Sequence, residues 1–188
     1  MKQILIINAD INKSSITEAL INAYRDGALI NASVIKQIAI ADLIFNPNRQ
    51  FINRLNEPEP DLADAIKFIN WANHVVIFCP VYKDSIHTKI KGFFDRIFLP
   101  DQIFKIGSNA SNNFSGKSAR IISILDEAAW NDWLINERST YLPIKKNILE
   151  KCFIKPVRTS TIGHLYSIEN EYSKKWLAKL HSFGSKVI

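Results

Sequence analysis

The sequence predicts an α/β domain in which helices cover both faces of a parallel sheet. Short apolar runs with the length of buried strands alternate along the chain with segments whose apolar residues recur at helical spacing. Each helical segment between two such runs is suited to the crossover that parallel strands require, and right-handed crossovers put helices on both faces. We therefore expect a strand–helix pair repeated five times in one domain spanning residues 1–188.

The first strand and helix lie at the N-terminus. Residues 3–8 are apolar and too few for a helix, so we expect a buried strand there. A helical stripe of apolar residues follows, from Ile16 to Tyr24. Ser15 and Glu18 have the spacing of a capping box, so Ser15 is expected to accept a hydrogen bond from the first turn. Gly27 is expected to end this helix.

The remaining elements continue the alternation. Further strands are expected at Val34–Ile40, Val75–Cys79, Arg120–Leu125 and Arg158–Ile162, and further helices at Pro60–Trp71, Ile86–Phe98, Ala128–Lys151 and Ile168–Phe183. Pro80, which has no N–H, is expected to end the third strand. Gly184 is expected to close the last helix, and His74 to lie at the surface. The polar residues 100–116 are expected to form an exposed loop.

The composition is that of a globular protein, with 47% hydrophobic and 22% charged residues. No apolar segment approaches the roughly 20 residues needed to cross a bilayer, so no membrane span is expected. The apolar start is too short for a signal peptide and is interrupted by Asn8-Ala9-Asp10. We expect a cytoplasmic protein.

The net charge of +6 makes nucleic acid a partner to consider. Lysine and arginine are spread along the chain, however, and no nucleic-acid-binding motif is present, so we expect no such partner. A diffuse positive field suits small anionic ligands equally well. The two cysteines, Cys79 and Cys152, are far from any metal-ligand spacing, so no metal site is expected.

The segment DINKSSIT, residues 10–17, connects the first strand to the first helix. A helix N-terminus offers free amide donors and the positive end of the helix dipole. Lys13 and the hydroxyls of Ser14, Ser15 and Thr17 lie nearby in the sequence. The segment lacks the glycines of known phosphate-binding loops, so a phosphate cradle and a simple capped helix are both open interpretations.

The segment after the third strand is the second part of the predicted site. Ligands of open α/β sheets bind beyond the carboxyl ends of the strands, and in the order 2-1-3-4-5 the first and third strands are neighbours. A phosphate at residues 10–17 and a flat ring against Pro80–Asp84 would then belong to one ligand. The backbone of Val81, Tyr82 and Lys83 would face the polar edge of the ring.

The sequence resembles the flavodoxin-like NAD(P)H dehydrogenase (quinone) family, which includes azoreductases and potassium-efflux regulatory subunits. The segments that carry the resemblance are KQILIINADINKSSITEAL, EPDLADAIKFINWANHVVIFCPVY, KGFFDRIFLPDQIFK, GKSARIISILDEAAW and KCFIKPVRTSTIG. The most specific is KGFFDRIFLP, which is close to the family pattern K-G-F-x-D-R-V-F-x-P. The resemblance covers most of the chain.

The resemblance implies a flavodoxin-like three-layer sandwich with a five-stranded parallel sheet of order 2-1-3-4-5. It also implies a homodimer, a noncovalent FMN or FAD, and NAD(P)H as the donor of two electrons to a small quinone-like acceptor. Flavin carries the hydride in such proteins, so no catalytic side chain is assigned. The expected cofactor-binding residues are Asp10, Ser15, Ile16, Thr17, Pro80, Val81, Tyr82, Lys83, Ser123 and Asp126.

The chain departs from the family pattern at this site. Asp10-Ile11 stands where the family has His-Pro, and a carboxylate beside a phosphate is repulsive unless it faces away or binds through water or a cation. Tyr82-Lys83 replaces an aromatic pair, and Glu127 adds a further anion. Two functions therefore remain open, a flavin-dependent oxidoreductase and a regulatory or binding subunit that has lost flavin catalysis.

Overall fold

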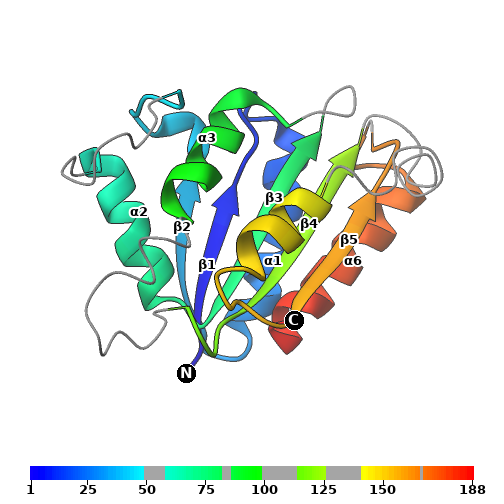
Figure 1. The fold of residues 1–188 in the computed structure, drawn as a ribbon. Coiled ribbons are helices and arrows are strands. Elements are labelled where there is room, and N and C mark those ends of the chain that lie inside the picture. Colours follow the sequence, from blue (N-terminus) through cyan, green and yellow to red (C-terminus); the bar gives the residue numbers. More distant parts are fainter. Residues whose placement is uncertain (49–57, 82–85, 99–113, 126–140, 166) are drawn as a thin grey trace.

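The structure is a computed structural model that describes residues 1–48, 58–81, 86–98, 114–125, 141–165 and 167–188. Its strands form a five-stranded parallel sheet of order β2-β1-β3-β4-β5 (Figure 1). The strands are β1 Gln3–Asn8, β2 Val34–Ala39, β3 His74–Val81, β4 Ser118–Leu125 and β5 Val157–Ile162. The helices are α1 Ser15–Leu29, the 3₁₀ helix η1 Ile40–Asp42, α2 Pro60–Trp71, α3 Thr88–Ile97, the π-helix η2 Pro143–Leu149 and α6 Glu171–Lys186. The predicted fold class and strand order are confirmed.

Two layers of helices enclose the sheet (Figure 1). Helices α1 and α6 cover one face and α2, α3 and η2 the other, each over its own cluster of buried apolar residues. Along β1, Leu5 and Ile7 belong to the α2–α3 side, whereas Ile4 and Ile6 belong to the α1–α6 side. This alternation follows from the two-residue period of a strand that is buried on both faces.

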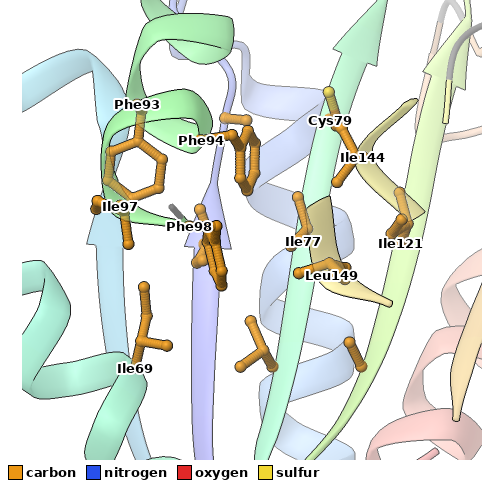
Figure 2. Packing of buried hydrophobic residues seen from close by; sticks show 14 of the residues in the cluster. Ile69, Ile77, Cys79, Phe93, Phe94, Ile97, Phe98, Ile121, Ile144 and Leu149 are labelled. Atoms are coloured by element: carbon orange, nitrogen blue, oxygen red, sulfur yellow. The ribbon is translucent and has the colours of Figure 1, made fainter. Parts of the chain in front are cut away.

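The described residues of the KGFFDRIFLP segment, 91–98, form most of α3 and its C-cap and contribute to the core on the α2–α3 side. Figure 2 shows Phe94 and Phe98 lying over β1 and β3, beside Ile144 and Leu149 of η2. Arg96, which is 4% exposed, donates to both carboxylate oxygens of Glu59 just before α2. This ion pair lowers the pKa of Glu59 to about 2, because the guanidinium hydrogen-bonds the carboxylate more strongly than burial penalises its charge. Within the described residues, Arg96 thus joins two helices of the fold.

The prediction that Pro80 ends the third strand is wrong, since β3 continues to Val81 and Pro80 pairs with Ile124. Alternate residues of a strand direct their backbone groups to alternate sides, and the carbonyl of Phe78 accepts from Ala9 on the β1 side. Pro80 therefore turns toward the same side. The β1 ladder ends with the pair Asn8–Phe78. The missing N–H of Pro80 consequently costs no hydrogen bond of the sheet.

The predictions that Gly27 and Gly184 end their helices are also wrong. Helix α1 continues to Leu29 and α6 to Lys186. A Cβ on Gly27 would lie 2.0 Å from the main-chain oxygen of His181, and one on Gly184 would lie 2.0 Å from that of Tyr24. Each glycine therefore lets the two helices approach closely, which requires the absence of a side chain.

His74 is 1% exposed, so the prediction that it lies at the surface is wrong. Its Nδ1 is 2.7 Å from the Ser118 hydroxyl oxygen, and its Nε2 has no hydrogen-bond partner in the described part of the chain. Burial and the nearby charge of Arg120 lower the pKa of His74 to about 3. The ring is therefore neutral in the folded protein at neutral pH.

None of the helices formed by the described residues is both long enough and apolar enough to cross a membrane.

Replacing Gly184 with alanine should destabilise the protein by about 1–3 kcal/mol, because the new Cβ has to push α1 and α6 apart. Urea unfolding of the variant measures the loss. Lys175→Ala, an exposed change in the same helix, is the control and should stay within about 0.5 kcal/mol of the wild type. Equal stability of Gly184→Ala and the wild type would contradict the close approach.

The stability of the wild type should fall as the pH drops below 6.5, the ordinary pKa of histidine. Below that pH His74 is protonated in the unfolded chain, whereas in the folded protein it stays neutral until the pH reaches its folded-state pKa of about 3. The loss therefore accumulates between those two values. In His74→Gln the same pH series of urea unfolding should be flatter, and parallel profiles for the two proteins would refute this assignment.

Candidate functional site

The candidate site lies at the edge of the sheet formed by the carboxyl ends of β1 and β3. The pair Asn8–Phe78 is the last of the β1–β3 ladder, and the Ala9 N–H donates to the Phe78 carbonyl at 2.8 Å. Beyond that point β3 continues to Val81, while the chain after β1 turns into α1. The N-terminus of α1 and the end of β3 therefore flank the point where β1 stops (Figure 1).

Asp10 organises the loop between β1 and α1. Its side chain is 1% exposed and its two oxygens accept from this loop. Oδ1 accepts from the Asn12 N–H at 2.9 Å. Oδ2 accepts from the Ser14 N–H at 3.0 Å and from the Ser14 hydroxyl at 2.6 Å. These contacts close a turn in which an aspartate binds backbone groups two and four residues further on.

Ser14, not the predicted Ser15, is the N-cap of α1. Its backbone is extended, with φ −65° and ψ 142°, and its Oγ accepts from the Thr17 N–H at 3.2 Å. The same Oγ lies 2.9 Å from the Thr17 hydroxyl oxygen. Asp10 holds both the amide and the hydroxyl of Ser14, and α1 begins at Ser15, one residue earlier than a cap at Ser15 would allow.

Burial raises the pKa of Asp10, but hydrogen bonds outweigh that effect, so the pKa is lower than the ordinary 3.8. These bonds come from the Ser14 and Thr17 side chains and from the amides of Ser14 and Asn12. Lys13 instead pairs with Asp42 of η1, and no cation among the described residues forms an ion pair with Asp10. Hydrogen bonds and the positive end of the α1 dipole therefore hold this charge.

The other predicted residues of this loop differ in exposure. The side chain of Ser15 is exposed, that of Ile16 is half-buried and that of Thr17 is 1% exposed. The first amides of a helix have no acceptor within the helix, so those of Ser15 and Ile16 remain available there. The loop thus has two kinds of hydrogen-bond donor. One kind already donates to the Asp10 carboxylate, and the other consists of the first two amides of the helix.

The predicted residues of β3 and β4 are placed as follows. Pro80 and Val81 are buried at the end of β3. Ser123 is 1% exposed, pairs with Cys79, and its hydroxyl has no hydrogen-bond partner among the described residues. Its neighbours Ile121 and Leu125 pack on the α2–α3 side, so its side chain faces that side. Tyr82, Lys83 and Asp126, and also Glu127, lie outside the described residues.

A cavity of about 380 Å³ lies between α3 and η2. Phe94, Ile144 and Ile148 contribute apolar walls, and Lys91 and Asp95, which form an ion pair of 3.1 Å, lie among its lining residues. None of the predicted site residues that the structure describes is among the residues lining it.

The phosphate end of the site can be tested against a flavin, because its residues are described. A phosphate held by the Asn12 and Ser14 amides and the Ser14 hydroxyl would have to displace Asp10, because all three groups donate to its carboxylate. The residues present therefore do not fit a flavin phosphate in these contacts. The sequence showed Asp10 as a departure, but it did not show which way its carboxylate turns.

Comparison with known proteins places the chain in a family. A family model described as having a flavodoxin-like fold matches residues 2–182, so the chain belongs to that family. This confirms the resemblance at the level of the fold. None of the curated proteins searched matches the chain.

Solved structures share this fold. Smu.1420 from Streptococcus mutans is 23% identical with a TM-score of 0.77, covering 98% of this chain and 99% of that one. An NAD(P)H:quinone oxidoreductase from Methanothermobacter marburgensis is 14% identical with a TM-score of 0.79, covering 99% and 96%. An FMN-dependent NADH-azoreductase from Bacillus anthracis, in complex with FMN, is 16% identical with a TM-score of 0.76, covering 100% and 99%. At these identities the likeness shows the fold alone.

Removing the Asp10 carboxylate should destabilise the folded protein at neutral pH. Asp10→Ala deletes the acceptor of three hydrogen bonds, and we expect a loss of about 1–3 kcal/mol in urea unfolding. Asp42→Ala is the control, because the Lys13–Asp42 pair is more than half exposed and worth about 0–1 kcal/mol.

The stabilisation that the Asp10 carboxylate provides should decrease as the pH falls. The folded pKa of Asp10 is depressed, so its contribution is complete above the ordinary value of 3.8 and declines as the pH falls toward the folded value. The stability difference between the wild type and Asp10→Ala should therefore shrink in acid below 3.8. A difference that is absent at neutral pH, or that grows in acid, would show that the carboxylate does not hold the loop.

Proposed function

We propose that the protein is a flavin-dependent oxidoreductase. In this proposal it transfers two electrons from NADH or NADPH to quinone-like acceptors, and it does so as a cytoplasmic homodimer. The flavin, FMN or FAD, is noncovalent and lies at the edge of the sheet between the ends of β1 and β3. Membership of the flavodoxin-like family and the oxidoreductase names of its structural neighbours support this class of activity.

The proposal rests on the observation that β3 continues beyond the residue where β1 ends. Ligands of doubly wound sheets bind where adjacent strands lead to opposite sides of the sheet. Here β1 leads into α1 on one face and β3 leads into α3 on the other. The loop of Asp10 and the end of β3 at Val81 therefore border one crevice in this proposal.

A bound flavin would supply the hydride chemistry, and the protein would supply position and electrostatics. The main chain at Pro80 and Val81, with Tyr82 and Lys83 following in the sequence, would support the ring. No part of this proposal relies on Asp10 contacting a phosphate.

One observation favours a second function, a regulatory or binding subunit that no longer uses a flavin. The amides of Asn12 and Ser14 already have an acceptor within the protein, so the loop is complete without a cofactor. A subunit of this kind would keep the fold and its core while losing the electron-transfer reaction.

Titration of the purified protein with riboflavin, FMN and FAD separates the two functions. Flavin fluorescence reports binding, and absorbance reports oxidation of NADH and NADPH with and without a soluble quinone. The first function predicts quenching by at least one flavin and nicotinamide oxidation that needs both flavin and quinone. Protein that neither quenches any of the three flavins nor oxidises nicotinamide would rule it out and leave the regulatory function.

A further inference from the structure

The Asp10 carboxylate accepts the kind of hydrogen bonds that a bound anion would accept in front of α1. It accepts from two backbone amides and one hydroxyl at distances of 2.6–3.0 Å. The donors come from a turn of five residues that leads directly into the helix. Amide and hydroxyl donors in front of a helix N-terminus are the groups that bind phosphate in proteins. In this chain they bind a side chain of the protein.

The loop is also built to keep Asp10 in this position. The Asp10 N–H donates to the Asn8 side-chain oxygen at 2.9 Å, and Asn8 is itself only 6% exposed. The Ala9 N–H is fixed by Phe78 of β3. Asp10 is therefore tied to the sheet through its main chain and to the helix through its carboxylate.

Two negative groups cannot share these donors. Each amide has a single proton, and the amides of Asn12 and Ser14 direct theirs at Asp10. A phosphate at the same place would have to displace the carboxylate and would face its charge at close range. No cation among the described residues pairs with Asp10 to offset that repulsion.

We propose that Asp10 is a built-in anion that keeps phosphate off the β1–α1 loop and so determines which flavin this protein accepts. The crevice takes a flavin through its ring and side chain, with no gain from a terminal phosphate. Riboflavin and FMN consequently bind with similar affinity, and replacing Asp10 restores a preference for FMN. The part that concerns flavin rests on the proposed function, whereas the part that concerns the loop and phosphate does not.

The first experiment uses inorganic phosphate alone. Melting temperatures of the wild type, Asp10→Ser, Asp10→Asn and Asp42→Asn are measured at neutral pH in phosphate and in chloride of equal ionic strength. The wild type and Asp42→Asn should show only the same small rise in phosphate that exclusion of this salt gives folded proteins in general. Asp10→Ser should rise by about 3 °C or more beyond the wild type once phosphate reaches ten times its Kd.

The variants separate charge from position. Asp42→Asn changes the net charge by the same amount as Asp10→Asn, and it frees Lys13 close to the same loop. If the melting temperature of Asp42→Asn rises in phosphate as much as that of the Asp10 variants, the overall charge of the protein, and not the position of the Asp10 carboxylate, determines phosphate binding. Asp10→Asn keeps an acceptor oxygen for the loop amides, so it tests the proposal even when Asp10→Ser does not fold.

The second experiment compares riboflavin with FMN by fluorescence quenching. For the wild type we expect Kd values within about threefold of each other, and for Asp10→Ser an FMN affinity at least about tenfold above that for riboflavin. A wild type that already prefers FMN tenfold would overturn the proposal, because its phosphate would then be held despite Asp10.

The two experiments distinguish failure of this proposal from failure of the proposed function. If no protein binds either flavin but Asp10→Ser or Asp10→Asn gains stability in phosphate, the oxidoreductase assignment fails and the role of Asp10 stands. If neither Asp10 variant responds to phosphate, or the wild type responds as strongly, the role of Asp10 is refuted whatever the flavins do.

Discussion

The parallel pairing of β1 with β3 is the constraint on which the candidate site depends. The ladder stops at Asn8 opposite Phe78, while β3 remains paired with β4 up to Val81. This offset leaves the last residues of β3 without a strand on one side, and it forces the chain after Asn8 to turn into α1. The same offset explains why a proline fits within β3, because Pro80 turns toward the side where β1 has ended.

A helix that begins directly after a buried strand has to satisfy its first amides within a short loop. In a phosphate-binding protein the ligand contributes to this, and the apo loop is left to water. Here Ser14 caps the amide of Thr17, and Asp10 accepts from the amides of Asn12 and Ser14 just before the helix. A carboxylate of the chain therefore occupies donors that an anion could otherwise use.

The fold was largely predictable from the sequence because strands buried on both faces read as short apolar runs, and amphipathic helices as stripes. The errors share one cause, which is that tertiary neighbours are not visible in a local pattern. Gly27 and Gly184 look like helix ends, but each lies where the other helix approaches. His74 looks exposed because it is polar, yet β1 and β4 flank it in the sheet.

The strand order could be predicted from the sequence, and it brings the start of α1 and the end of β3 at Val81 to one edge of the sheet. The chain's departure from the family pattern at Asp10 was also visible in the sequence. The direction of its carboxylate was not, because Asp10 could equally face solvent. The spacing of Asp10 to Asn12 and Ser14 is typical of an aspartate that closes a turn on backbone amides, and that signal would have identified Ser14 as the cap.

The most direct measurement of the central claim is an amide NMR titration of the wild type with FMN at neutral pH. If Asp10 keeps its donors, the Asn12 and Ser14 amide resonances stay in place while resonances at the end of β3, such as Val81, shift. If the Asn12 and Ser14 amides move together with those of β3, the phosphate has taken the loop from Asp10 and the account is wrong.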